Sequence, residues 1–466
     1  MITAVDLLDG YRRRTISPVE ATEAALAAIT TYDPLVNAFV LVDADGALAA
    51  AKAAEQRWAS GRPLGPVDGV PMSIKDMFLT QGWPTLRGSR LIEEAGPWPE
   101  DAPAVARLRT SGAVLLGKTT TPEFAWKGLT DSLRYGTTGN PWDAGLHAGG
   151  SSGGSATAVG LGMGAVSIGT DGGGSVRIPA AFTGTTALKP TYGLVPLYPP
   201  SPFGTLSHAG PMTRTVADAA LMLDVITGFD ARDWSAMPTP AGSFGDGLTD
   251  PIEGLRIAFS PTLGYASNDT TVEDAVRAAV AVLAAAGAEV TEVDPGIADP
   301  IEAFQTLWFA AAAKLLDGRD HELKLVDPGL VAIVEQGRKL TAADYLDAVA
   351  VRMELGIRMG RFHTAYDLLV TPTMPIPAFS SELQAPEGWP SELWTTWTPY
   401  TYPFNMTQQP ALSVPCGFTG DGLPVGLQII GPRHADRLVL RAGQAFQDRT
   451  DWHTRVPALV RAQTKG

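Results

Sequence analysis

The apolar positions of the first sixty residues recur with a helical period. Ser17 precedes Pro18, and Glu20 stands three residues after the serine, which is the pattern of a helix N-cap with a capping box and a proline in the first turn. An alanine-rich segment follows, and a second alanine-rich segment runs over 43–60. The pattern predicts helices throughout residues 3–58.

From residue 69 the pattern changes to short apolar runs that alternate with helical stretches. The runs are bounded by glycine and proline, as buried strands are, and cover 69–74, 113–117 and 165–171. Residues 152–164 and 216–226 have the helical pattern. Lys75 follows the first run directly, so this lysine is predicted at the end of a strand. The alternation predicts an α/β domain with a largely internal sheet.

The C-terminal half repeats this alternation after a loop. Residues 230–254 are rich in proline, glycine, serine and aspartate. A strand is predicted over 255–261, a long helix over 271–287 and a further strand over 288–294. We therefore expect the C-terminal part to extend the same architecture.

Composition narrows the class of protein. The chain has 466 residues, 45% of them hydrophobic, and a net charge of −14, which repels nucleic acid and anionic membranes. No export signal or membrane span is evident. The single cysteine, Cys416, excludes internal disulfides and is expected to be buried in a cytoplasmic protein. The expected partner is a small molecule, with no nucleic acid, membrane or cofactor, and the chain is expected to be a monomer or homodimer.

Two glycine- and serine-rich clusters carry the candidate chemistry: AGGSSGGSA over 148–156 and TDGGGSVRIP over 170–179. Neither matches a P-loop or a dinucleotide-binding fingerprint, although residues 149–153 fit the G-x-S-x-G pattern with Ser151 at its centre. Such segments form turns, or they direct several backbone N–H groups toward a point beside a nucleophile. No histidine lies near Ser175 in the sequence, so its activation needs another base.

Several motifs in order resemble the amidase signature family. They are GVPMSIKD, LLGKTTTPEFAW, the block GGSSGGSATAVGLGMGAVSIGTDGGGSVRIPAAFTGTTALKPTYGLVP, GPMTRTVADAALML, YDLLVTPTMPIPAF and ALSVPCGFTGDGLPVGLQIIGP. The resemblance covers about residues 65–450. It implies a single large α/β/α sandwich with a central mixed sheet and helices on both faces. Residues 1–64 would form an N-terminal helical segment, 65–225 the signature core and 226–466 a C-terminal extension with substrate-covering segments.

The resemblance also implies the roles of three residues. Ser175 resembles the nucleophile, Ser151 the bridging serine that follows a cis peptide bond, and Lys75 the base. A lysine serves as a base when burial lowers its pKa, and a hydroxyl between two groups passes a proton in both directions. The implied oxyanion hole is formed by backbone N–H groups of Ser175 and the preceding glycines Gly172, Gly173 and Gly174. No metal is implied.

Neighbouring residues are given supporting roles. Asp171 and Arg177 are expected to brace the glycine loop, and Ser152 and Ser155 to pack or to cap a helix. His147 is expected at the surface or beside the site. Substrate contacts are expected from Phe124, Trp126, Gly149 and Gly150. The sequence departs from the family pattern at Ala148, Gly172 and Thr183, which leaves the shape of the loop open.

The leading hypothesis is an amidohydrolase that cleaves a carboxylic amide through an acyl-enzyme, with esters, hydrazides or carbamates as further substrates. Aromatic residues predict an apolar, weakly charged pocket and a preference for neutral hydrophobic or aryl amides: Phe124, Trp126, Trp308, Trp394, Trp397, Tyr400 and Tyr402.

Three alternatives stay open. The chain could be the A subunit of a glutamine-dependent tRNA amidotransferase, although segment 381–405 is rich in aromatic residues where a glutamine site would need charged groups for the two ends of the amino acid. A Ser-His-Asp esterase would use Ser151 with one of the later histidines, His208, His321, His363, His434 or His453. A binding protein with a relic site is the third, and the intact set of Lys75, Ser151 and Ser175 argues against it.

Overall fold

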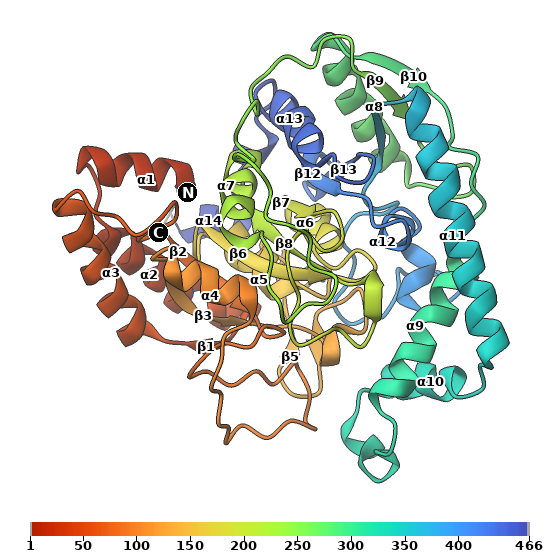
Figure 1. The fold of residues 1–466 in the computed structure, drawn as a ribbon, viewed down its shortest axis with the longest axis horizontal. Coiled ribbons are helices and arrows are strands. Elements are labelled where there is room, and N and C mark those ends of the chain that lie inside the picture. The colour runs from red at the N-terminus through yellow and green to blue at the C-terminus, as the bar shows by residue number, and fades with distance from the viewer. Residues whose placement is uncertain (1, 464–466) are drawn as a thin grey trace.

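A mixed sheet of eleven strands runs through the molecule in the order β1-β3-β2-β6-β8-β7-β12-β13-β11-β9-β10 (Figure 1). The computed structural model describes residues 2–463. The strands are β1 Phe39–Val42, β2 Pro71–Lys75, β3 Val114–Thr119, β6 Val166–Asp171, β7 Thr186–Lys189, β8 His208–Thr213, β9 Arg256–Phe259, β10 Glu289–Glu292, β11 Leu368–Pro372, β12 Ala411–Phe418 and β13 Pro424–Ile430. A separate small sheet pairs β4 Asp131–Ser132 with β5 Gly136–Thr137.

Helices surround the sheet (Figure 1). They are α1 Ala4–Arg13, α2 Pro18–Val36, α3 Ala44–Ala59, α4 Pro103–Thr110, α5 Gly153–Gly160, α6 Arg177–Thr183, α7 Val216–Ile226, α8 Thr270–Ala285, α9 Ile301–Leu315, α10 Pro328–Gly337, α11 Ala342–Ala365, α12 Tyr402–Met406, α13 Asp436–Gln447 and α14 Ala458–Gln463. Along the longest axis, α1–α3 lie at one end and α9–α11 at the other.

The sheet has a parallel part on each side of an antiparallel middle, and the edge strand β1 is antiparallel to β3. Strand β2 pairs in parallel with β3 and β6, and β9 pairs in parallel with β10 and β11. The strands between β6 and β11 are antiparallel neighbours. Because β7 pairs with β12, the sheet continues across residue 226, where the C-terminal extension was expected to begin. The α/β class with a mixed sheet is confirmed.

Alternate residues of the strands pack into different apolar clusters, as a period of two requires. On β13, Leu427 and Ile429 join the cluster that includes side chains of α7, α8 and α13. The next residue, Ile430, joins a second cluster with side chains of α6, α9 and α11. Helices therefore cover both faces of the sheet.

The prediction of helices throughout the N-terminal part is wrong at one short segment. Residues 3–58 are not helical throughout, because the edge strand β1 separates α2 from α3 and pairs antiparallel with β3. Asp33 ends α2 by accepting the backbone N–H groups of Ala38 and Phe39. The capping box at Ser17 is confirmed: its hydroxyl accepts the backbone N–H of Glu20, and the Glu20 carboxylate accepts the backbone N–H of Ser17. Within the described part of the chain, every helix is too short or too polar to span a lipid bilayer.

Candidate active site

Lys75 is fully buried at the end of β2, where the parallel neighbours β3 and β6 enclose it. Its Nζ lies 2.6 Å from Ser151 Oγ, 2.9 Å from Ser152 Oγ and 2.8 Å from Thr170 Oγ1. Burial lowers the pKa of Lys75 well below its ordinary value, and the negative charge of Asp171 offsets only part of this shift. A neutral amine has a lone pair, so one of these hydroxyls can donate to it.

Ser151 precedes helix α5 and brings the first glycine cluster against the lysine. The peptide bond between Gly150 and Ser151 is cis. The backbone N–H of Ser152 donates to the carbonyl of Ser175 at 3.1 Å, which joins the two glycine clusters directly. Ser152 was expected only to pack or cap, so its contact with Lys75 is an additional finding. Ser155 does pack, with its hydroxyl 2.8 Å from that of Thr119.

Ser175 lies between β6 and α6, and only 4% of its surface is exposed. It lines a pocket of about 600 Å³, mouth included, together with Ser151, Thr170 and Gly172. The remaining wall is mainly apolar: Met77, Phe78, Arg87, Phe124, Ala125, Leu197, Tyr198, Pro199, Pro200, Ser201, Pro202, Phe203, Ser207 and Trp308. The structure thus brings both predicted serines to one cavity. A larger hollow beside α11 contains neither serine.

The glycine loop is held tightly between aromatic side chains. A Cβ atom at position 172 would lie 3.0 Å from the ring of Trp308, and one at position 173 would lie 2.6 Å from that of Trp394. The N–H of Gly174 donates to Asp171 Oδ1 at 2.8 Å. Gly174 was expected to contribute an oxyanion donor, but its N–H is already used by this carboxylate. Gly172, Gly173 and Ser175 keep that candidate role.

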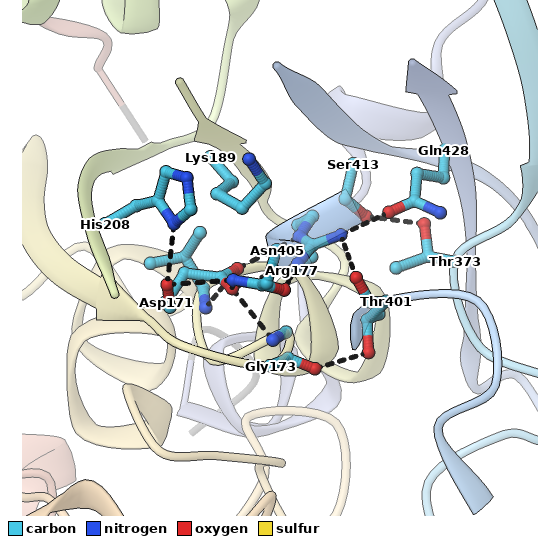
Figure 2. A network of polar contacts seen from close by, with 12 residues as sticks. Asp171, Gly173, Arg177, Lys189, His208, Thr373, Thr401, Asn405, Ser413 and Gln428 are labelled. Atoms are coloured by element: carbon cyan, nitrogen blue, oxygen red, sulfur yellow. Dashed lines mark hydrogen bonds and ion pairs between the residues drawn. The ribbon is translucent and has the colours of Figure 1, made fainter. Parts of the chain in front are cut away.

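Asp171 and Arg177 form the buried ion pair that braces the loop (Figure 2). Arg177 Nε and Nη2 donate to the two carboxylate oxygens, each at 2.9 Å. The other N–H groups donate to Asn405 Oδ1 at 2.6 Å, Thr401 O at 2.9 Å and Gln428 Oε1 at 2.8 Å. All five guanidinium donors are therefore satisfied. Burial opposes ionisation of Asp171, but Arg177 outweighs it and holds the pKa of the carboxyl below its ordinary range.

The network reaches the loop and His208, whose Nδ1 lies 3.3 Å from the carbonyl oxygen of Asp171, and the buried Lys189 acts on Asp171 through its charge. Thr401 Oγ1 donates to the carbonyl of Gly173 at 2.6 Å, so a segment far along the chain holds the loop in place (Figure 2). Lys189 is fully buried, and burial lowers its pKa well below the ordinary value. His208 Nδ1 bonds to the carbonyl of Leu206 at 2.9 Å, and burial likewise lowers its pKa.

Histidines do not reach the two serines. None of the six, all within residues 2–463, lines the pocket that contains Ser151 and Ser175. His147 is fully buried, with Nε2 2.7 Å from the carbonyl of Leu383, so of its two expected positions, at the surface or beside the site, the surface position is wrong. No three His, Cys, Asp or Glu side chains of the described residues are close enough to hold a metal ion.

Only some of the residues that were expected to contact the substrate line the pocket. Phe124 and Trp308 line the pocket, whereas Trp126 does not. The ring of Trp126 packs against Gly329, where an added Cβ would approach within 2.7 Å. Gly149 packs on Pro179 and Phe182, and Gly150 packs on Leu129, so these glycines shape the backbone behind the pocket. Trp397, Tyr400 and Tyr402 are buried core residues, and Trp394 packs on the glycine loop.

Part of the pocket wall has no counterpart among the residues predicted from the sequence. Met77 and Phe78 follow the lysine strand directly, and the segment 197–203 carries the prolines and aromatics of the opposite wall. The proximity of Met77 and Phe78 to the lysine strand was a usable signal for these two residues. Arg87 had no comparable signal, because its position depends on a loop conformation.

The site thus combines a serine hydroxyl hydrogen-bonded to a buried lysine with a second serine and a glycine loop on one pocket. The chain belongs to the amidase family, whose model matches residues 20–440. It is 37% identical over 466 residues to the acylamidase of Rhodococcus erythropolis, covering 98% of this chain and 97% of that one. The A subunit of the glutamyl-tRNA(Gln) amidotransferase of Chloroflexus aggregans is 38% identical over 475 residues, with 96% of each covered.

A solved structure extends the similarity to the whole fold. The crystal structure of a bacterial aryl acylamidase of the amidase signature family superposes with a TM-score of 0.90, at 29% identity, covering 97% of both chains. Both the family and the class of enzyme predicted from the sequence are confirmed: the chain is an amide-hydrolysing enzyme.

Proposed function

We propose that this enzyme cleaves the C–N bond of a carboxylic amide through an ester of Ser175. In this mechanism Ser175 Oγ attacks the carbonyl carbon, and Ser151 takes its proton while giving its own to neutral Lys75. The proton then passes back from Lys75 through Ser151 to the leaving amine. Water next attacks the Ser175 ester, giving up its proton through Ser151 to Lys75, and releases the acid and Ser175. The observation that carries the proposal is the 2.6 Å contact between Lys75 Nζ and Ser151 Oγ, in full burial beside the pocket of Ser175.

The oxyanion of the tetrahedral intermediate would be stabilised by N–H groups of Gly172, Gly173 and Ser175. One such donor is worth roughly 3 kcal/mol of transition-state stabilisation. Thr401 and Asp171 hold the peptide plane between Gly173 and Gly174 by its carbonyl and its N–H, and this plane lies between those that carry the Gly173 and Ser175 donors. Preorganised donors act without reorganisation during the reaction.

The proposed substrates are hydrophobic or aryl amides, with esters, hydrazides or carbamates open to the same acyl-enzyme chemistry. Aromatic rings of Phe124, Phe203 and Trp308 on the pocket wall support this choice. The names of two similar proteins, an acylamidase and an aryl acylamidase, point the same way. We also propose that the enzyme acts without a partner protein. A cytoplasmic location is proposed as well, because the single cysteine is free and buried.

The amidotransferase alternative has support from the similarity to the amidotransferase chain of Chloroflexus aggregans. A glutamine site, however, needs an anionic partner for the ammonium of the amino acid. Among the described residues that line the pocket, none is acidic. The esterase alternative is disfavoured because Ser151 contacts a lysine and the pocket contains no histidine among the residues that the structure describes.

The test combines a substrate panel with labelling of the nucleophile. We expect the purified chain alone to hydrolyse an acyl 4-nitroanilide at least about tenfold better in kcat/KM than glutamine, a difference of about 1.4 kcal/mol. A fluorophosphonate adduct should map to Ser175 by peptide mass spectrometry. Ser175→Ala should abolish both turnover and labelling while keeping the circular dichroism spectrum.

Ser155→Ala is the matched control, since it removes a buried hydroxyl from the same glycine-rich segment without touching Lys75. It should keep turnover and lose only about 1 kcal/mol of stability. Labelling of Ser151 in place of Ser175 would contradict the assignment of the nucleophile. Equal turnover of glutamine and the anilide would favour the amidotransferase alternative.

A further inference from the structure

One charged side chain stands in the pocket of Ser175. Arg87 is half-buried and lines the cavity together with Met77, Phe78 and Phe124. It is the only charged residue among the described residues that line this cavity. A weakly charged pocket was expected from the sequence, so this guanidinium is an unpredicted feature.

The guanidinium has no counter-ion within the described residues. Arg87 Nε is buried without a hydrogen-bond partner. The negative charge that acts on Arg87 is that of Asp76, which forms a fully buried ion pair with Lys118 at 3.0 Å. Asp76 also accepts the backbone N–H of Leu86 at 3.2 Å and the hydroxyl of Tyr135 at 3.4 Å. Asp76 is therefore already occupied, and the charge of Arg87 remains available to the cavity.

The backbone that directs Arg87 into the pocket is held in an uncommon conformation. Arg87 has a φ of 53°, and Phe124 and Ala125 have φ values of 49° and 59°. The two segments support each other, because the N–H of Phe124 donates to the carbonyl of Arg87 at 2.8 Å. Non-glycine residues in this region are strained, and such residues concentrate at ligand sites. All three line the same cavity.

From these contacts we propose that Arg87 binds a carboxylate carried by the substrate apart from its scissile amide. A guanidinium matches a carboxylate in a two-point contact, and a desolvated cation without a partner gains most from an anion. No acidic residue of the described chain lines the pocket to bind an ammonium, so a zwitterionic amino acid is disfavoured. The inference rests on the proposed function and narrows its substrates to hydrophobic amides with one negative charge.

The experiment compares carboxylate substrates with neutral counterparts. Succinyl 4-nitroanilide against butyryl 4-nitroanilide tests a carboxylate on the acyl side. N-butyryl-4-aminobenzoate against its methyl ester tests one on the amine side. We expect one of the two carboxylates to exceed its neutral counterpart by about tenfold in kcat/KM in the wild type.

Arg87→Gly removes the guanidinium and adopts the same positive φ without strain. It should reduce the carboxylate advantage, which is the ratio of kcat/KM for a carboxylate to that for its neutral counterpart in the same variant, to less than about twofold. Arg14→Gly is the matched control, because Arg14 also has a positive φ, 58°, but is exposed at the end of α1. It should keep the full preference. Arg87→Gln serves as a second variant if the glycine variant does not fold.

Two results would overturn the proposal: a wild type that prefers neither carboxylate, or a preference that survives in both Arg87 variants. Both leave Ser175 labelling and neutral anilide turnover intact, so they are distinguishable from failure of the proposed function. Loss of Ser175 labelling with retained hydrolysis would instead contradict the acyl-enzyme itself.

Discussion

Lys75, the base of the proposed mechanism, lies in an unfavourable position for a charge. Its ammonium form would be buried among three hydroxyl groups, and the pKa shift shows that burial outweighs the attraction of Asp171. The unfolded chain binds the proton up to about pH 10.4, whereas the folded chain releases it at a lower pH. In that window the unfolded state binds more protons, so this residue makes stability rise with pH.

Lys75→Met should therefore change two pH profiles. Wild-type kcat/KM should fall as the pH drops below the lowered pKa of Lys75, because the protonated amine accepts no proton. The variant should lose at least about a thousandfold in kcat. In urea unfolding at a series of pH values, the wild type should gain stability with rising pH more steeply than the variant.

Lys314→Met is the matched control, since Lys314 is exposed on α9 with 82% of its side chain accessible. It should reproduce both wild-type profiles. Parallel unfolding slopes for the wild type and Lys75→Met would mean that Lys75 is charged in the folded protein, which would contradict its role as a neutral base.

Single residues also show what the sequence could reveal of the site. Lys75, Ser151 and Ser175 stood in recognisable motifs, and the structure places the lysine against one serine and both serines on one cavity. Trp126 stood beside Phe124 in the sequence, yet residues so close in sequence point in different directions and only Phe124 lines the pocket. Arg87 escaped notice because its exposure to the cavity depends on a positive φ, which no periodicity encodes.

The loop between β6 and α6 is the element on which the geometry of the site depends. Gly173 is enclosed by Trp394 and Phe304, which an added Cβ would approach within 2.6 Å and 2.8 Å. Gly173→Ala should displace the loop and lower kcat/KM by about a hundredfold, the size of a lost oxyanion donor. Steady-state kinetics with an acyl 4-nitroanilide measure this loss.

Gly356→Ala tests whether the effect belongs to the loop. Gly356 lies inside α11, and an added Cβ would have no atom within 4 Å. Alanine there should leave turnover unchanged and stabilise the protein by about 0.5–1 kcal/mol, because glycine is unfavourable inside a helix. Wild-type kinetics for Gly173→Ala would show that the aromatic rings yield and that the loop is not rigid.

A helix or strand was predictable from the sequence where its apolar positions recurred with one regular period. Helix α7 and strand β2 were found from their patterns, and α8 was found within two residues. Strand β1 was missed because four residues between two long helices carry too short a pattern, and its pairing with β3 is a tertiary contact. The pairing of β7 with β12 likewise joins segments that lie far apart in the sequence.

At the scale of the whole molecule, the ion pair of Asp171 and Arg177 joins the site to the C-terminal half of the sheet. Arg177 contacts Asn405 on α12 and Gln428 on β13, and all of these side chains are buried (Figure 2). The loop between β6 and α6 is therefore held by buried contacts with segments from both halves of the chain. No local sequence pattern predicts this coupling.

Arg177→Met should accordingly affect both stability and catalysis. It leaves the Asp171 carboxylate buried without its counter-ion, which costs about 3–5 kcal/mol. The urea midpoint, followed by circular dichroism, should fall, and kcat should fall because Gly173 and Gly174 lose their brace. Arg277→Met is the control, since Arg277 forms ion pairs with Glu273 and Glu292 at the exposed surface. Exposed pairs contribute less than about 1 kcal/mol, so equal losses in the two variants would contradict the bracing role of Arg177.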